Sequence, residues 1–175
     1  MIVLVGESAS GKSTIERELS TIGFNRVISY TTRPKRENES DGIDYHFITK
    51  MDFEERLRDR FFAEHTKYRD WYYGSAVRDC TNDKVIVANP HGLRQLNKMS
   101  NINVTSFYIK APERVRLIRM LNRSDDIIEC FRRIFSDQGV FQNIEEETTY
   151  ILDGCKTIDE LCREIVKIID KGIDE

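Results

Sequence analysis

The stretch Gly6-Glu7-Ser8-Ala9-Ser10-Gly11-Lys12-Ser13 follows directly after the apolar run Ile2-Val3-Leu4-Val5. Its two glycines enclose four residues and are followed by Lys-Ser, which is the phosphate-binding loop pattern. The run before the loop predicts a buried strand, and residues 12–20 predict a helix, so strand, loop and helix occur in the required order. Backbone N–H groups gathered at the start of a helix attract polyphosphate. The opening of the chain therefore predicts a nucleotide site.

The residues of this loop have separate expected roles. Lys12 is expected to lie along the β- and γ-phosphates, and Ser13 to offer its hydroxyl to Mg²⁺, which otherwise keeps water and phosphate oxygens as ligands. We therefore expect ATP and Mg²⁺ as cofactors, with Lys12 catalytic and Ser13 as the metal ligand. The residues expected to bind the donor are Gly6, Glu7, Ser8, Ala9, Ser10, Gly11, Lys12, Ser13 and Thr14. A plain tight turn of small residues is disfavoured, because both the pattern and its context match.

The composition of the chain limits the classes of protein to which it could belong. The chain has 175 residues, 39% hydrophobic and 33% charged, which suits one soluble domain with a sizeable core. A net charge of −3 excludes a generally basic surface, so any positive field is local. The apolar stretches are too short to span a bilayer, and Met1 leads straight into the first strand, so we expect a cytoplasmic protein. The cysteines and histidines lack metal-type spacing.

Strands alternate with helices along most of the chain. The expected strands are residues 2–5, 26–29, 45–48, 84–88, 104–109 and 148–152, and the expected helices are 12–20, 53–60 capped by Asp52, one starting at Pro90, 113–121, and a last one with Thr157 and Glu160 as its capping box. This rhythm predicts a three-layer α/β/α fold with a central parallel sheet. Residues 30–78 interrupt it with polar turns and aromatics. We expect a core of 1–29 and 79–175 and a small inserted lobe of 30–78 with little helix.

The inserted lobe contains candidates for a second site. Arg33 and Arg36 lie three apart in an extended, proline-stiffened segment, and Tyr45 follows soon after. The planar guanidinium of arginine suits bidentate phosphate binding, so this group could hold a monophosphate dianion. Taken alone, such a run is more often a solvated charged loop.

The same segment resembles the guanylate kinase family. Residues 29–36, Ser-Tyr-Thr-Thr-Arg-Pro-Lys-Arg, and residues 41–47, Asp-Gly-Ile-Asp-Tyr-His-Phe, are similar to the family signature S-x-T-T-R-x-x-R followed by G-x-D-Y-x-F. The likeness continues through Glu64 and Tyr73-Gly74-Ser75, where the family has an acidic residue and then Y-G-T/S. It covers the chain from Gly6 to Arg133 in the family's order.

This resemblance implies a nucleoside monophosphate kinase that phosphorylates GMP or dGMP with ATP. It implies that the acceptor phosphate is held by Arg33, Arg36, Tyr45 and Tyr73, and that the base is faced by Ser29, Glu64 and Ser75. The chemistry agrees, because guanine offers N1–H and an exocyclic amine as adjacent donors that one carboxylate can accept together. Adenine lacks that donor pair and would leave a buried Glu64 unsatisfied.

The arginine-rich segment 122–138 resembles the family's lid. Arg119 and Arg123 lie four apart at a helix end, and Arg132 and Arg133 follow. The resemblance implies that Arg119, Arg123 and Arg133 act as catalytic cations, since phosphoryl transfer needs in-line placement and positive charge around the transferred group. Without the family, residues 127, 128, 131 and 134 indicate an ordinary solvated amphipathic helix.

Two features depart from the family pattern. The strand end that usually reads L-D-V/I-D-x-Q-G is here Ile86-Val87-Ala88-Asn89-Pro90-His91-Gly92, so Val87 and Asn89 replace its two aspartates. We include Asn89 among the expected acceptor-binding residues, since an amide can still coordinate or hydrogen-bond. The lid reads Arg123-Ser124-Asp125-Asp126 and is about one residue shorter than the usual form.

Three functions therefore stay open from the sequence. The first is a GMP or dGMP kinase. The second is a related kinase for another phosphorylated acceptor such as ribose 1,5-bisphosphate, which would explain Asn89 but not Glu64. The third is a non-catalytic binding module, as in scaffold proteins, which the intact Lys12 and Ser13 disfavour. As partners we expect only nucleotides, neither nucleic acid nor membrane, with the protein a monomer or homodimer.

Overall fold

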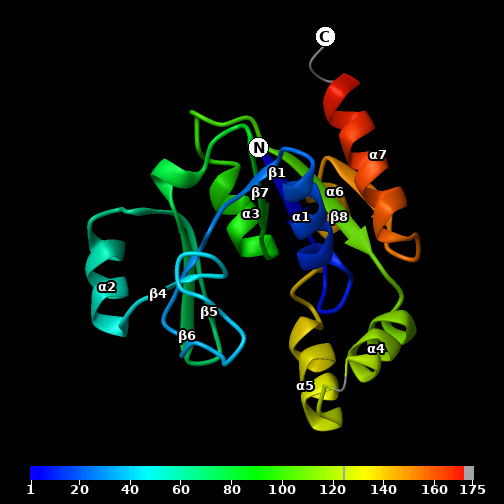
Figure 1. Ribbon diagram of the computed structural model, residues 1–175, viewed down its shortest axis with the longest axis horizontal. Helices are drawn as coiled ribbons and strands as arrows, with labels where there is room; N and C mark the ends of the chain where they lie inside the picture. Colours follow the sequence, from blue (N-terminus) through cyan, green and yellow to red (C-terminus); the bar gives the residue numbers. More distant parts are fainter. Residues whose placement is uncertain (124, 172–175) are drawn as a thin grey trace.

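The computed structural model describes residues 1–123 and 125–171, so Ser124 of the expected lid and residues 172–175 lie outside it. Its centre is a five-stranded sheet in the order β2-β7-β1-β8-β9. Figure 1 labels the three middle strands of this sheet, β7, β1 and β8. The strands are β1 Ile2–Val5, β2 Asn25–Arg26, β7 Lys84–Val87, β8 Thr105–Lys110 and β9 Tyr150–Asp153. All neighbouring strands pair in parallel, which confirms the predicted sheet.

Two layers of helices cover the sheet. Helices α1 Lys12–Thr21 and α7 Ile158–Lys171 lie on one face, and α3 Pro90–Leu96 and α6 Ile144–Glu147 lie on the other. The side chains of β1 alternate between the two apolar layers, since Ile2 and Leu4 pack with the first pair of helices while Val3 and Val5 pack with the second. This arrangement confirms the three-layer fold.

Residues 30–76 contain a second, four-stranded sheet in the order β4-β3-β6-β5. Its strands are β3 Tyr30–Thr31, β4 His46–Phe47, β5 Phe62–Tyr68 and β6 Trp71–Ala76. Helix α2 Lys50–Arg58 packs on it through Phe53, whose ring lies 4.3 Å from that of Phe62 between centroids. Tyr30 belongs to the same cluster. The aromatic residues of this segment therefore form a core of their own.

Several expected boundaries were wrong. Helix α2 begins at Lys50 rather than Phe53, and its N-cap is Thr49, not Asp52. The hydroxyl of Thr49 accepts the Asp52 N–H while the Asp52 carboxylate accepts the Thr49 N–H, so the two residues form a capping box. The strand expected at 26–29 is confined to Asn25–Arg26, and that expected at 45–48 to His46–Phe47. Helix α6 was not predicted at all.

The lid segment is attached through a small apolar cluster. Helix α5 Ile127–Asp137 packs against α4 Glu113–Asn122 through Cys130, Ile134 and Met120. The apolar spacing correctly predicted this helix, but Ile128 is 74% exposed and does not face the core. None of the helices in the described part of the chain is long and apolar enough to cross a membrane.

The contact between α7 and the sheet gives a stability prediction. Ile165 of α7 is fully buried against that sheet face, so Ile165→Ala should lower the free energy of unfolding by about 2–5 kcal/mol, because the cavity it leaves cannot close completely. Urea titration followed by circular dichroism measures the loss. Ile118→Ala, at a helical site that is 46% exposed, is the matched control and should change stability by less than about 1 kcal/mol. Equal losses in the two variants would contradict this account of the core.

Candidate active site

The loop Gly6–Ser13 connects the end of β1 to the start of α1, and its two glycines are required by geometry. A Cβ at Gly6 would lie 2.8 Å from the carbonyl oxygen of Ile109 on β8, so no larger residue fits there. Gly11 has φ of +111°, a conformation that side chains disfavour, and it caps α1. The loop is thus fixed against the sheet on one side and the helix on the other.

Carbonyl groups of the loop accept hydrogen bonds from side chains of Lys12, within the loop, and of Arg119, on α4. The ammonium of Lys12 donates to the Glu7 carbonyl at 2.8 Å, and Arg119 donates to the Ser10 carbonyl at 3.1 Å and to the Gly154 carbonyl at 2.7 Å. Thr14 and Ile15 donate their N–H groups to the Gly11 carbonyl, whereas the first two N–H groups of α1, those of Lys12 and Ser13, lack carbonyl partners within the helix and are available to an anion. A phosphate site requires this arrangement, in which carbonyl groups have partners within the protein and N–H groups are available to the anion.

The charge of Lys12 is set by its surroundings. Burial lowers the pKa of Lys12 to about 8, and the negative charges of Asp137 and Glu7 oppose that shift. An ammonium group with this pKa is mainly protonated at pH 7 and would be further stabilised by a phosphate. The loop therefore presents one enclosed cation beside its free N–H groups.

A cavity of about 330 Å³ lies where the loop, the inserted lobe and the lid segment meet. It is lined by Ser8, Ala9, Lys12, Ser13, Arg33, Arg36, Tyr68, Arg69, Trp71, Tyr73, Arg123, Glu129 and Arg133. Seven of the residues expected from the sequence as catalytic or acceptor-binding, or as the metal ligand, are thus brought together. Among the described residues lining it, Glu129 is the one carboxylate, so this local surface is strongly positive although the chain is net negative.

An adjoining cavity of similar size extends into the inserted lobe. Ser13 and Arg36 line both cavities, and Ser29 and Tyr45 line only this second one. The phenol ring of Tyr45 lies 6.0 Å from that of Tyr73 and within cation–π distance of the Arg33 guanidinium. The four residues expected to hold an acceptor phosphate therefore form one cluster.

Three residues expected to face a base are connected by hydrogen bonds. The hydroxyls of Ser29 and Ser75 are 2.9 Å apart, and Ser75 donates to Glu64 Oε1 at 2.8 Å. Glu64 is only 7% exposed, and burial raises its pKa to about 7 although the hydrogen bond from Ser75 opposes that shift. A ligand that offers N–H donors would stabilise the ionised form of this buried carboxylate.

Two expected residues have structural contacts away from these cavities. Asn89 is the N-cap of α3, since its Oδ1 accepts the Gly92 N–H at 2.8 Å, and its Nδ2 donates to Thr66 on β5 at 3.0 Å. Both polar atoms of the amide are therefore used. Arg119 contacts the carbonyls of the loop rather than the cavity, although Arg123 and Arg133 of the same expected set do line it.

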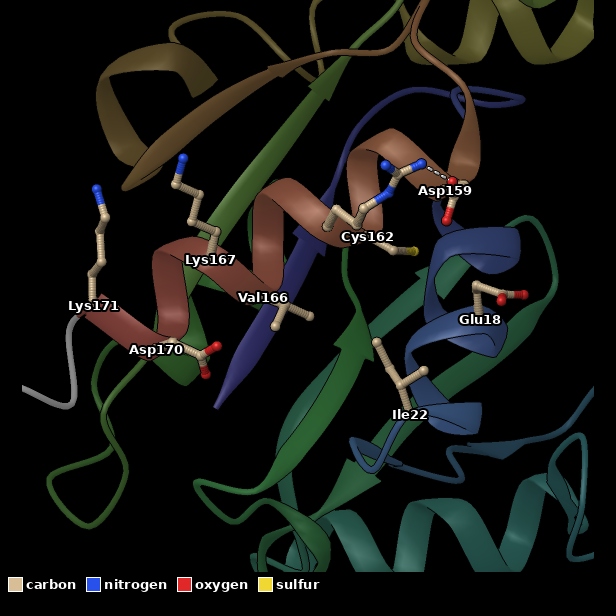
Figure 2. A pocket seen from close by; sticks show the side chains of 9 residues that line it. Glu18, Ile22, Asp159, Cys162, Val166, Lys167, Asp170 and Lys171 are labelled. Atoms are coloured by element: carbon tan, nitrogen blue, oxygen red, sulfur yellow. Dashed lines mark hydrogen bonds and ion pairs between the residues drawn. The ribbon is translucent and has the colours of Figure 1, made fainter.

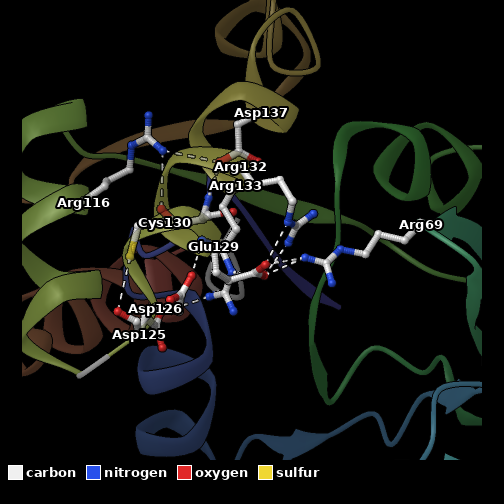
Figure 3. Close-up of polar contacts among 10 residues, drawn as sticks. Arg69, Arg116, Asp125, Asp126, Glu129, Cys130, Arg132, Arg133 and Asp137 are labelled. Atoms are coloured by element: carbon white, nitrogen blue, oxygen red, sulfur yellow. Dashed lines mark hydrogen bonds and ion pairs between the residues drawn. The ribbon is translucent and has the colours of Figure 1, made fainter.

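Sequence reasoning missed the carboxylates that hold the arginines. Glu39 accepts from Arg33 at 2.7 Å and from the Arg36 backbone N–H at 2.9 Å. Glu129 accepts from Arg69 of the lobe at 2.6 Å and from Arg133 at 3.1 Å (Figure 3). Of these contacts, only the one between Glu129 and Arg133 could have been predicted from the sequence, because residues four apart on a helix lie on the same face. The other contacts join residues that are far apart in the chain or lie in an irregular loop.

Another hollow, of about 480 Å³, lies between α1 and α7 (Figure 2). It is lined by Glu18 of α1, by Ile22 directly after this helix, and by a row of α7 side chains that includes Asp159 and Arg163. The last two form an ion pair with each other. None of the expected site residues lines this hollow, so it does not compete as the candidate site.

Comparison with known proteins agrees with this geometry. The family model "Guanylate kinase" matches residues 1–172. A guanylate kinase of Rickettsia bellii is 33% identical over 83% of this chain and 81% of its own length. The zebrafish protein MAGUK p55 subfamily member 7 is 35% identical over 82% of this chain, but this covers only 27% of that protein. The crystal structure of guanylate kinase from Anaplasma phagocytophilum has the same fold, with a TM-score of 0.69 over 98% of this chain and 85% of that one at 18% identity. From its phosphate-binding loop to its last helix, this chain belongs to the guanylate kinase family.

Proposed function

We propose that this chain transfers the γ-phosphoryl group of ATP to GMP or dGMP. The observation that carries the proposal is the hydrogen-bonded series from Ser29 through Ser75 to Glu64, which begins at a cavity shared with the phosphate-binding loop. A buried carboxylate and two hydroxyls at one end, and a cation-rich loop at the other, suit a guanine nucleotide and a polyphosphate donor.

Glu64 would select the base. Its ionised carboxylate accepts the N1–H and the exocyclic amine of guanine, while Ser29 and Ser75 complete the polar surface around it. Its 7% exposure makes an unsatisfied charge costly, so a base without that pair of donors is rejected.

Arg33, Arg36, Tyr45 and Tyr73 would hold the acceptor phosphate. Glu39 keeps the Arg33 guanidinium and the backbone of Arg36 in place through bonds of 2.7 and 2.9 Å, so the Arg33 guanidinium needs little reorganisation when the acceptor binds. Asn89 would act on the acceptor site indirectly, because it caps α3 and its side chain joins this helix to β5 of the acceptor lobe.

The donor would occupy residues 6–14. Lys12 contacts the β- and γ-phosphates, and the hydroxyl of Ser13, which lines both cavities, is the protein ligand that fits Mg²⁺. One protein oxygen is enough, because Mg²⁺ usually keeps water and phosphate oxygens in its remaining positions. When bound, the ion offsets negative charge on the β- and γ-phosphates.

The reaction needs no covalent intermediate with the protein. An oxygen of the acceptor phosphate attacks the γ-phosphorus, the bond from that phosphorus to the β–γ bridging oxygen breaks, and ADP leaves with that oxygen. Lys12, Arg123 and Arg133 stabilise the charge on the transferred group. Arg119 contributes through the loop carbonyls that it binds.

The donor-binding, acceptor-binding and lid functions belong to separate segments of the chain. Residues 1–29 and 79–175 form the donor-binding core of one domain, 30–78 the acceptor lobe, and about 122–138 a lid that excludes water. We further propose that the protein acts on free nucleotides in the cytoplasm, as a monomer or homodimer, and uses neither nucleic acid nor membrane.

Release of ADP with a panel of acceptors tests the function. With ATP and Mg²⁺, the purified protein should turn over GMP and dGMP, and AMP, dTMP and ribose 1,5-bisphosphate should react at least about 100-fold more slowly, because they lack the paired N–H donors. Preference for ribose 1,5-bisphosphate would establish the second function instead. ATP binding without turnover of any acceptor would leave a binding module.

The pH dependence of GMP use tests the role of Glu64. Because burial raises the pKa of Glu64 to about 7, kcat/KM for GMP should fall about tenfold for each pH unit below 7, as the carboxylate becomes protonated. Glu64→Gln should abolish this dependence and lower kcat/KM at pH 8 by about 100-fold, while the dissociation constant for ATP stays within about twofold. Equal weakening of ATP and GMP binding would refute the separate assignment of the two sites.

The same carboxyl group should make stability depend on pH. Its pKa rises from 4.5 to about 7 on folding, so its contribution to stability is complete below pH 4.5 and is lost as the pH rises through 7. The loss amounts to about 3 kcal/mol by pH 8, and Glu64→Gln should remove it. Urea unfolding at pH 5 and pH 8 measures the difference. Glu55→Gln, an exposed site on α2, is the control and should retain the wild-type dependence.

A further inference from the structure

Two side chains that the proposed reaction does not use bind the backbone of Ser8. Asp137 Oδ2 accepts the Ser8 N–H at 2.8 Å, and Arg116 Nη1 lies 3.4 Å from both the Ser8 carbonyl and the same Asp137 oxygen (Figure 3). Arg116 Nε also donates to the Ala111 carbonyl at 3.2 Å. We call Arg116 and Asp137 the Ser8 clamp. Arg116 is only 6% exposed, so the clamp is an enclosed arrangement rather than a surface ion pair.

The clamp adjoins a strained point of the loop. Ala9, the next residue, has φ of +62°, in the left-handed region that residues with a side chain rarely adopt. Such a conformation persists only where the surrounding structure fixes it. The bonds to the Ser8 N–H and to the Ser8 carbonyl fix the two peptide groups that flank Ser8, and the second of these leads into Ala9.

The clamp also joins the donor loop to the lid. Arg116 belongs to α4, while Asp137 is the last residue of α5, the helix that carries Glu129 and Arg133. Ala9 packs on the apolar cluster between these helices. The shape of the loop therefore depends on where α4 and α5 lie.

We propose that Arg116 and Asp137 are positioning residues for the donor nucleotide, which hold Ser8 and the left-handed turn at Ala9 in the conformation that binds the phosphates. The inference rests on the proposed function in taking residues 6–14 as the ATP site. Neither side chain touches the acceptor lobe, so loss of the clamp weakens ATP binding and leaves GMP binding unchanged.

Calorimetric titration of the full chain tests this split. Asp137→Ala, which removes the acceptor for the Ser8 N–H, should weaken binding of ATP with Mg²⁺ about tenfold and change binding of GMP by less than about twofold. Asp137→Asn keeps an acceptor oxygen and should weaken ATP binding less. Glu145→Gln is the control: this exposed carboxylate pairs with Lys110 at 2.7 Å rather than with the clamp, and its removal should change neither affinity.

Two double variants separate positioning from general stability. Arg116→Met with Asp137→Ala should bind ATP no more weakly than the poorer single variant, because both residues hold Ser8 and contact each other. Ala9→Gly with Asp137→Ala should bind ATP more tightly than Asp137→Ala alone, since glycine adopts the left-handed turn without strain. A role confined to folding would lower the melting temperature without producing this rescue.

Several results would overturn the proposal. Unchanged ATP affinity in a folded Asp137→Ala protein would do so, as would equal weakening of ATP and GMP, or additive losses in the first double variant. If Asp137→Ala does not fold, Asp137→Asn carries the test, and equal weakening of ATP and GMP binding in that variant would overturn the proposal. Wild-type protein that binds ATP but phosphorylates neither GMP nor dGMP would refute the proposed function while leaving this inference open to the same titrations.

Discussion

The phosphate-binding loop works only if its carbonyl groups have partners within the protein. A peptide segment carries donors and acceptors in equal number, so N–H groups can converge on an anion only when the carbonyls have partners elsewhere. Here Lys12 binds the Glu7 carbonyl, Arg119 binds the Ser10 carbonyl, and Arg116 lies beside that of Ser8. Two of these three side chains come from α4. The pairing of β8 with β1 is therefore a condition of the site, because α4 follows β8 directly and the Ile109 carbonyl approaches Gly6.

The second constraint is the repulsion among the cations of the cleft. Five arginines and Lys12 line one cavity of about 330 Å³ in a chain whose net charge is −3. Carboxylates offset part of this repulsion, since Glu39 binds Arg33 and Glu129 binds both Arg69 and Arg133. Each of these pairs is partly exposed, so its own contribution to stability is small. Their larger effect is to fix the guanidinium groups in place, and nucleotide phosphates can share or replace the same donors.

Local patterns in the sequence predicted the sheet and the donor loop, because each of these depends on a short stretch of chain, whereas the roles of the acceptor residues came from the family resemblance and stay predictions. The run before Gly6, the spacing of Arg33 and Arg36, and the Thr157 capping box are such local patterns. Contacts between distant residues left no such pattern. The pairs Arg69 with Glu129 and Ser8 with Asp137 join residues 60 and 129 positions apart. Helix α2 was misplaced for a different reason: Thr49 and Asp52 both suit a cap, and the capping box uses both.

The neutral strand end at Asn89 is consistent with an ionisable Glu64. A methyl group on Gly92 would lie 2.9 Å from Glu64 Oε2 and 3.5 Å from Asn89 Oδ1, so the two side chains face the same small space. A second carboxylate there would repel the charge of Glu64 and raise its pKa beyond the value of about 7 that burial gives it. It would also lose the donor that the amide gives to Thr66. Asparagine caps α3 as well as aspartate would, and it joins α3 to the acceptor lobe without adding charge. The departure from the family pattern at this position thus leaves the buried carboxylate able to ionise near neutral pH, where an acceptor with paired N–H donors can bind it.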